Sequence, residues 1–141
     1  MNEFSTLFEQ VQKYSRRLTG ISDSLVNMVL EDLATLAERE LTFLLEENKK
    51  DLDRMEITNP MYDRLLLTES RIKGIASEIR QVQSLPSPLH HNLEEKKLEN
   101  GLLLRKISVP LGVIGIIYEA RPNVTFDVFS LAIKSGNGLV L

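Results

Sequence analysis

Four residues in the last third of the chain, three polar ones and a proline, form a cluster suited to binding or polarising a ligand. They are Glu119, Arg121, Pro122 and Asn123. An arginine guanidinium binds carboxylates and phosphates, and an asparagine amide donates hydrogen bonds to a carbonyl oxygen or an oxyanion. Proline stiffens the backbone between the arginine and the asparagine. We therefore expect this cluster to line a substrate or cofactor cleft.

The two segments that flank the cluster support this expectation. Residues 113–118 are apolar and rich in β-branched side chains, which predicts a strand buried on both faces. An apolar helical pattern begins at Val124. Strand, polar loop and helix is the arrangement in which α/β proteins bind ligands, just outside the carboxyl end of a strand. The N-terminus of the helix would also favour an anionic ligand group near Arg121.

A purely structural interpretation of the cluster stays open beside the functional one. Asparagine is a common N-cap, so Asn123 is a candidate cap for the helix that follows. Glu119 and Arg121 carry opposite charges and are candidates for an ion pair on the surface. The two interpretations are compatible for Asn123, which can cap a helix and still face a ligand.

A second polar motif, Lys134-Ser-Gly-Asn137, ends the same helix. We favour a structural role, in which Lys134 interacts with the C-terminus of the helix, Gly136 takes the left-handed conformation and Asn137 supports the turn. A phosphate-binding role is weaker, because anions prefer helix N-termini.

The first 84 residues predict a set of helices that pack by their apolar faces. Apolar residues recur with helical period over residues 3–19, 23–50, 61–67 and 69–84. Ser22 and Thr68 are candidate N-caps for the second and the fourth of these helices. The helices carry no catalytic constellation, so we expect their apolar stripes to form a core.

The rest of the chain predicts a loop followed by an α/β unit. Residues 85–101 are polar, contain prolines and predict a solvated loop that ends in a turn at Asn100-Gly101. A strand, a second strand, a helix and a third strand are then expected over residues 102–109, 113–118, 124–134 and 139–141. The first strand is expected to be antiparallel to a neighbour. The last three segments are the beginning of a parallel βαβ unit, as in a nucleotide-binding-type sheet, so the predicted class is α/β.

Composition excludes several classes of function. The net charge is −3, which offers no basic surplus for nucleic acid or an anionic membrane. No apolar run approaches the ~20 residues that cross a bilayer, and no signal-peptide pattern opens the chain, so we expect a cytoplasmic location. The chain has no cysteine, hence no disulfide, zinc–thiolate site or cysteine nucleophile of its own. We expect His90 and His91 to lie in a solvated loop and not in a metal site.

A family resemblance lies in the segment Val109-Pro-Leu-Gly-Val-Ile-Gly-Ile-Ile-Tyr-Glu-Ala-Arg-Pro-Asn-Val-Thr-Phe-Asp127, followed by Lys134-Ser-Gly-Asn137. It closely resembles the gamma-glutamyl phosphate reductase (glutamate-5-semialdehyde dehydrogenase) family of the aldehyde dehydrogenase superfamily. The specific part is Tyr118-Glu-Ala-Arg-Pro-Asn123, where ordinary aldehyde dehydrogenases typically have Pro-Trp-Asn-Phe-Pro. Supporting matches are Glu47-Asn-Lys-Lys-Asp-Leu52, Asp63-Arg-Leu-Leu-Leu67 and Arg71-Ile72. The resemblance covers nearly the whole chain.

The resemblance implies the second step of proline biosynthesis, in which NADPH reduces L-glutamate 5-phosphate to L-glutamate 5-semialdehyde and phosphate is released. A cysteine nucleophile forms a thioester, which hydride then reduces. The family fold comprises a nucleotide-binding domain, a catalytic domain and a short oligomerisation hairpin, so a homo-oligomer is expected. Glu119, Arg121, Pro122 and Asn123 would line the substrate or cofactor cleft, and the turn of Lys134, Gly136 and Asn137 would lie near NADP(H).

The chain departs from the family in its length and in its lack of cysteine. Family members continue with Arg-Gly-Gly, whereas this sequence stops at Leu141. We therefore expect residues 1–141 to be the N-terminal portion of the nucleotide-binding domain of an incomplete aldehyde-dehydrogenase-like fold, with the catalytic domain absent. Such a chain is expected to be inactive by itself and to be marginally stable, oligomeric or prone to aggregate.

Two alternatives stay open at this point. One is a fragment of a bifunctional pyrroline-5-carboxylate synthetase, against which stands the opening of the first helix directly after Met1. The other is a non-catalytic helical interaction module, whose helix 23–50 would pair with a partner helix.

Overall fold

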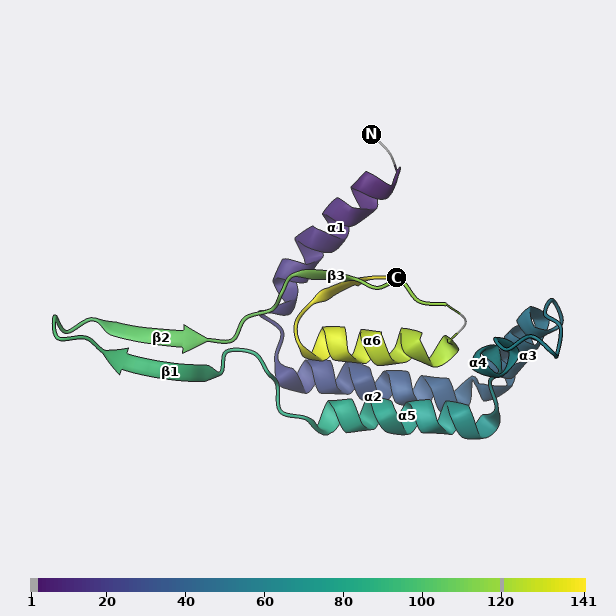
Figure 1. The fold of residues 1–141 in the computed structure, drawn as a ribbon. Helices are drawn as coiled ribbons and strands as arrows, with labels where there is room; N and C mark the ends of the chain where they lie inside the picture. Colours follow the sequence, from purple (N-terminus) through teal and green to yellow (C-terminus); the bar gives the residue numbers. More distant parts are fainter. Residues whose placement is uncertain (1–2, 120) are drawn as a thin grey trace.

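A computed structural model describes residues 3–119 and 121–141. Five helices come first: α1 (Glu3–Leu18), α2 (Asp23–Arg39), α3 (Leu41–Leu52), α4 (Tyr62–Leu65) and α5 (Glu69–Ser84). Two strands, β1 (Asn92–Lys97) and β2 (Leu103–Ile107), follow. Strand β3 (Val113–Gly115), helix α6 (Pro122–Lys134) and strand β4 (Gly138–Val140) complete the described chain (Figure 1).

The core lies between three helices, α2, α5 and α6, which run side by side (Figure 1). The cluster at its centre consists of Val26, Leu30, Ala34, Ile75, Ala76 and Ile79, with Phe126 and Ile133 of α6 packed against it. Ala34 and Ala76 are fully buried, and their small side chains let α2 and α5 approach closely. The apolar stripes predicted for these helices supply this core, although Leu25, Val29 and Leu36 of the α2 stripe are exposed.

Both predicted N-caps are present. The Ser22 hydroxyl accepts a hydrogen bond from Leu25 N at 3.3 Å, and the Thr68 hydroxyl accepts one from Arg71 N at 3.1 Å. Each bond satisfies one of the amides that a helix N-terminus leaves without a partner. The bounds predicted for the helix 69–84 are confirmed.

The single helix predicted over residues 23–50 is wrong, because two helices meet at Glu40. Its ψ of 19° bends the chain there. The backbone hydrogen bonds continue on both sides, from Glu40 N to Leu36 O and from Leu44 N to Glu40 O, each at 2.9 Å. The apolar pattern therefore runs on across the bend and cannot reveal it.

A buried asparagine on α3 gives the physical reason for the bend. The Asn48 amide donates to Leu65 O at 2.8 Å, and its oxygen accepts from Leu67 N at 2.7 Å. These two bonds satisfy backbone groups of the segment that joins α4 to α5, so they hold α3 against that segment and turn it out of line with α2.

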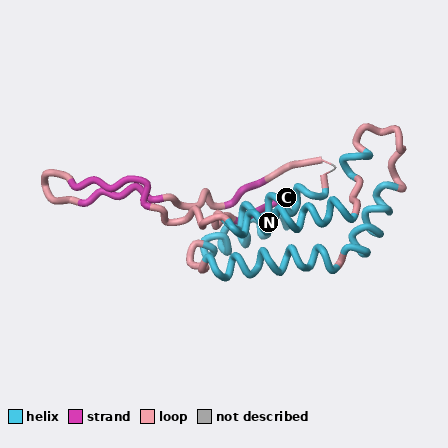
Figure 2. Tube along the Cα trace, turned by 90° about the horizontal axis from the view of Figure 1, so that it is seen from below, coloured by secondary structure: helices cyan, strands magenta, loops and turns pink. Residues whose placement is uncertain are grey.

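The loop predicted over residues 85–101 is wrong in its second half. Strand β1 pairs antiparallel with β2, and an ion pair of 2.7 Å joins Glu95 to Arg105 across the hairpin. The expected antiparallel neighbour of the strand 102–109 is thus β1. Every residue of both strands is exposed, and the hairpin projects away from the helices (Figures 1 and 2). Because neither face is buried, β1 has no alternating pattern that sequence analysis detects.

Strands β3 and β4 form a small parallel sheet, and α6 is the helix that connects them. Helix α6 covers one face, where Ile114 and Ile116 line an apolar hollow with Leu131 of α6. The expectation that residues 113–118 are buried on both faces is wrong, since Val113 is 39% exposed and Ile117 fully exposed. The sheet has two strands in the described structure, and Ile114 and Ile116 on the face toward α6 are only partly buried.

Within residues 3–119 and 121–141, every helix is too short or too polar to span a bilayer.

Candidate functional site

A cavity of about 380 Å³ lies where the segment before α6 meets α4 and α5. Its lining residues are Asp63, Arg64, Leu66, Leu67, Arg71, Gly74, Ile75, Glu78, Arg121, Pro122 and Asn123. Three of the four residues predicted to form a cleft, Arg121 to Asn123, are therefore brought together with residues that are more than 40 positions earlier in the chain. Glu119 is exposed and does not line this cavity.

The loop before α6 differs from its predicted geometry. Helix α6 begins at Pro122, two residues before the expected start, and Arg121 is the N-cap. Proline suits the first helical position because its φ is already helical and its missing N–H has no partner there anyway. The assignment of Asn123 as the cap is thus wrong. Its amide instead donates to Asp127 Oδ2 at 3.4 Å within the first turns of α6.

The surface ion pair considered for Glu119 and Arg121 is not formed. Neither residue takes part in a salt bridge within the described part of the chain. Arg121 is exposed on the cavity wall, so its guanidinium is available to a ligand.

Arg71 builds the opposite wall of the cavity. Its Nη1 donates to Asp63 O at 2.5 Å and to Leu66 O at 2.6 Å, and its Nη2 donates to Asp63 Oδ1 at 2.8 Å. These bonds fix the α4–α5 connection against the first turn of α5. Sequence analysis missed Arg64, Arg71, Gly74 and Glu78 as lining residues. The family matches Asp63 to Leu67 and Arg71-Ile72 contain two of these residues, Arg64 and Arg71, whereas no sequence signal marked Gly74 or Glu78.

A second hollow of about 480 Å³ continues along the groove between α5 and α6. Glu78 and Asn123 line both hollows, and Asp127 lines the second. Burial raises the pKa of the Asp127 carboxyl, while the hydrogen bond from Asn123 acts in the opposite direction. The charged carboxylate is therefore costly to the fold at neutral pH.

Asp127→Asn is expected to stabilise the chain at neutral pH. The pKa of Asp127 is higher in the folded chain than in the unfolded chain. The stability that its protonated carboxyl contributes is therefore complete below the unfolded pKa, near 3.8, and is lost as the pH rises through the folded pKa. Asparagine removes this loss and still accepts from Asn123. Urea denaturation between pH 3 and pH 7 measures the effect, with Asp32→Asn, an exposed site on α2, as the control for one lost charge. A wild-type chain that gains relative to Asp127→Asn as the pH rises would contradict the prediction.

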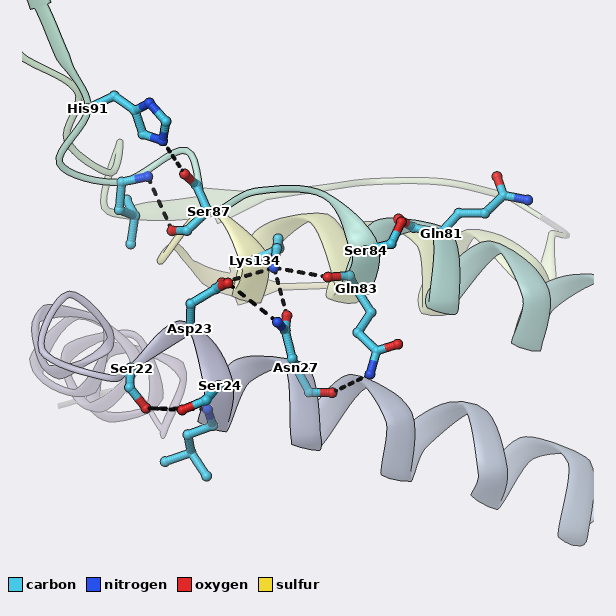
Figure 3. Close-up of polar contacts among 12 residues, drawn as sticks. Ser22, Asp23, Ser24, Asn27, Gln81, Gln83, Ser84, Ser87, His91 and Lys134 are labelled. Atoms are coloured by element: carbon cyan, nitrogen blue, oxygen red, sulfur yellow. Dashed lines mark hydrogen bonds and ion pairs between the residues drawn. The ribbon is translucent and has the colours of Figure 1, made fainter.

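Lys134 is the last residue of α6, and its ammonium group lies in a buried polar network with α2 and α5 (Figure 3). Its Nζ donates to Asp23 Oδ1 at 2.9 Å, to Asn27 Oδ1 at 2.6 Å and to Gln83 O at 3.1 Å. The predicted contact with the C-terminus of α6 is wrong: the carbonyl that it meets belongs to the last turn of α5. A buried ammonium requires acceptors, and α2 and α5 supply all three.

The turn after α6 is built as predicted but is buried. Gly136 has a φ of 70°, and Asn137 N donates to Ala132 O at 2.8 Å. The Asn137 side chain accepts from Gly112 N at 2.9 Å, which ties the turn to the loop before β3. A Cβ on Gly136 would lie 2.8 Å from Leu89 Cδ1, so this glycine is required by space as well as by conformation. The proximity of this turn to a cofactor stays a prediction.

The two histidines point to different backbone carbonyls. His90 Nε2 lies 3.4 Å from Thr19 O. His91 Nε2 lies 2.6 Å from Ser87 O, as Figure 3 shows. No group of three or more histidine or acidic side chains in the described ranges is placed to hold a metal ion.

Fold and site together define an α/β protein in which potential ligand-binding side chains follow a parallel strand and face a helical wall. Two solved structures have this fold over nearly the whole chain. The gamma-glutamyl phosphate reductase of Thermotoga maritima matches with a TM-score of 0.91 and 29% identity, over 98% of this chain and 34% of its own. The Saccharomyces cerevisiae enzyme of the same name matches with a TM-score of 0.91 and 25% identity, over 99% of this chain and 36% of its own. The predicted class, an incomplete α/β fold of this kind, is confirmed.

The sequence is more similar still to bacterial proteins of that name. The gamma-glutamyl phosphate reductase of Chlorobium phaeovibrioides is 61% identical over 133 residues, which are 94% of this chain and 32% of the relative. The chain thus spans about a third of the length of the curated relatives that it matches. No family model matches the chain. The resemblance inferred from the motif around Arg121 is confirmed.

Proposed function

We propose that this chain forms part of an enzyme that reduces L-glutamate 5-phosphate to L-glutamate 5-semialdehyde with NADPH, in proline biosynthesis. The observation that carries the proposal is the cavity lined by Arg121, Pro122 and Asn123. These residues belong to the segment by which the family differs from other aldehyde dehydrogenases, and they reach a common cavity with α4 and α5. The 61% identity to a relative of that name supports the same reaction.

In this proposal Arg121 binds an anionic group of the substrate. It precedes the N-terminus of α6, whose free amides attract the same charge. Asn123 lies in the first turn of α6 on the cavity wall, and among the described residues its side chain forms one long hydrogen bond, of 3.4 Å, to Asp127. Its amide can exchange that bond for a stronger one to the acyl oxygen of the substrate as negative charge develops there. The nucleophile comes from outside these 141 residues, because they contain no cysteine.

The nicotinamide cofactor of the proposed reaction supplies the hydride. Lys134 and Asn137 do not fit as its ligands. The three acceptors of Lys134 use its ammonium, and Asn137 uses its side chain within the turn. We therefore propose that the cofactor contacts lie on other residues, and Lys134, Gly136 and Asn137 have a structural role.

We also propose a cytoplasmic homo-oligomer in which the β1–β2 hairpin contacts a second copy. A two-stranded hairpin is marginally stable by itself. This one exposes Leu93, Leu103, Leu104 and Ile107, which need cover. Sedimentation equilibrium of the protein at micromolar concentration tests the assignment, and a monomer there would count against it.

A chimera tests the proposed reaction directly. In it, this chain replaces the matching third of the Chlorobium phaeovibrioides protein, and NADPH oxidation is followed with L-glutamate 5-phosphate. Arg121→Ala is expected to lower kcat/KM by about 10- to 100-fold, mainly through KM, because a hydrogen bond to a charged group contributes about 1.5–3 kcal/mol. Arg16→Ala, on the exposed surface of α1, is the matched control.

The outcomes separate the parts of the proposal. A folded chimera without activity rejects the proposed reaction for these residues. An active chimera whose KM and turnover do not respond to Arg121→Ala rejects the role of Arg121 and leaves the reaction in place.

A further inference from the structure

The charged residues of the cavity fall into two groups. Arg71 forms an ion pair with Asp63 and donates to the carbonyls of Asp63 and Leu66, so the fold itself uses its charge. The other group consists of Arg64, Glu78 and Arg121, which line the same cavity and form no salt bridge within the described part of the chain. The single further contact of Arg64 among the described residues is a weak one, from Nη1 to Met61 Sδ at 3.7 Å. The cavity thus presents two cations and one anion that the fold itself does not use.

These three charges define the chemistry of a complementary ligand. Two guanidinium groups call for two anionic groups, and one carboxylate calls for one cationic group. Leu66, Leu67 and Ile75 provide apolar surface in the same cavity, which suits a short methylene chain between the charges. A volume of about 380 Å³ is in the range of small-molecule sites.

A glycine inside helix α5 gives an independent indication that this space is kept open. Gly74 lies in the middle of α5, where glycine costs a helix roughly 1 kcal/mol relative to alanine. Packing does not require it, since a Cβ at this position would meet no atom within 4 Å. Gly74 lines the cavity, so a larger side chain there would extend into the space that a ligand needs.

We propose that this cavity recognises the amino-acid end of the substrate, with the Glu78 carboxylate accepting from its α-ammonium group and the Arg64 guanidinium binding its α-carboxylate. Arg121 then binds the remaining anionic group, the phosphate. This inference rests on the proposed function, and it deepens it by assigning substrate specificity to helices α4 and α5. Glu78 and Arg64 position the substrate and take no part in the bond changes.

The test compares two substrates in the chimera described above. L-glutamate 5-phosphate and glutaryl phosphate differ only in the α-ammonium group. The unaltered chimera is expected to prefer L-glutamate 5-phosphate in kcat/KM. Glu78→Gln is expected to raise KM for L-glutamate 5-phosphate about tenfold and to leave kcat/KM for glutaryl phosphate unchanged, because only the first substrate loses a charge-assisted hydrogen bond. Glu78→Asp is expected to restore part of the preference. Glu46→Gln, on the exposed side of α3, is the control.

A second variant tests the cavity without removing a charge. Gly74→Leu fills the space and also has the better helix propensity, so the melting temperature is expected to stay the same or to rise. KM for both substrates is expected to increase at least tenfold. Unchanged KM values with Gly74→Leu place the substrate elsewhere and overturn the inference.

The results distinguish a failure of the inference from a failure of the proposed function. If the chimera reduces L-glutamate 5-phosphate but Glu78→Gln changes both substrates equally or neither, the specificity assignment is overturned while the reaction stands. If the folded chimera reduces neither substrate, the proposed function fails and the inference fails with it.

Discussion

Lys134→Ala is expected to lower the free energy of unfolding of this chain by about 2–4 kcal/mol, a large fraction of a typical stability of about 5–15 kcal/mol. The Lys134 side chain is 4% exposed and joins three helices, through Asp23 and Asn27 of α2 and the Gln83 carbonyl of α5. Truncation leaves those acceptors without their donor and opens a cavity. The value lies below that of a fully buried pair because Asp23 is 42% exposed and regains water.

Two variants separate the polar network from the packing. Lys134→Met keeps most of the volume and removes the ammonium, so its loss is expected to lie between that of Lys134→Ala and the wild type. Lys73→Ala is the matched control, since its ion pair with Glu69 is on the surface, where water screens the charges and the pair contributes little to stability. Urea denaturation gives each value. Equal losses in the free energy of unfolding for Lys134→Ala and Lys73→Ala would show that the buried network contributes no more than a surface ion pair.

Leu30→Ala is expected to cost about 2–5 kcal/mol, because Leu30 is the largest side chain of α2 that is completely buried. It lies at the centre of the cluster that α2 forms with Ile75 and Ile79 of α5. The loss of stability has two parts. The variant lacks the free energy that burial of the removed carbon atoms contributes, and it has a cavity that rigid helices cannot close.

The same helix supplies the control for that substitution. Leu36→Ala, at a position 43% exposed, is expected to cost less than about 1 kcal/mol, because it removes little buried area. A comparison of denaturation midpoints at equal m-values decides the matter. If the two substitutions prove equally costly, the assignment of Leu30 to the centre of the core is wrong.

The sequence predicted those elements in which one period of apolar residues continues from cap to cap. Helix α5 is the best example, since Thr68 begins it, its four buried residues share one face, and Leu85-Pro86 ends it. The alternative of an interaction helix over residues 23–50 stays a prediction, and α2 uses only part of its apolar surface in the core, since Leu25, Met28 and Leu36 are exposed. Val26, Leu30 and Ala34 of α2 are packed in the core with α5 and α6.

The errors arose where a single polar contact or an exposed strand decides the structure. Asn48 sets the direction of α3 through two bonds to a segment about 18 residues away, which no local pattern contains. Strand β1 has charged residues on both faces, so it lacks the alternation on which strand prediction depends. Lys134 looked like a residue that compensates a helix dipole, and only the tertiary structure places Asp23 and Asn27 beside it.

The sequence predicted only one side of the candidate site, for a related reason. Arg121, Pro122 and Asn123 are adjacent in the chain and stand out between apolar segments. Arg64, Gly74 and Glu78 come from two other helices, and each by itself is an ordinary surface or helical residue. Residues that line a cavity from distant segments have no characteristic spacing in the sequence. They are therefore recognised as a site only once the fold is known.

The contact between α1 and strand β4 has a consequence for biosynthesis. Helix α1 packs on β4 where a Cβ on Gly138 would lie only 2.8 Å from the Cβ of Ser15. A ribosome makes Ser15 roughly 120 residues before Gly138, an interval of roughly 6 to 25 s at ordinary rates of elongation. During that interval Val11 and Ser15 of α1 lack the strand that they contact in the folded chain, although α2 and α5 can already pair. The nascent chain therefore exposes this side of α1 to chaperones for seconds. A substitution that weakens the Gly138 contact is expected to reduce the yield of folded protein by a larger fraction than it reduces the free energy of unfolding.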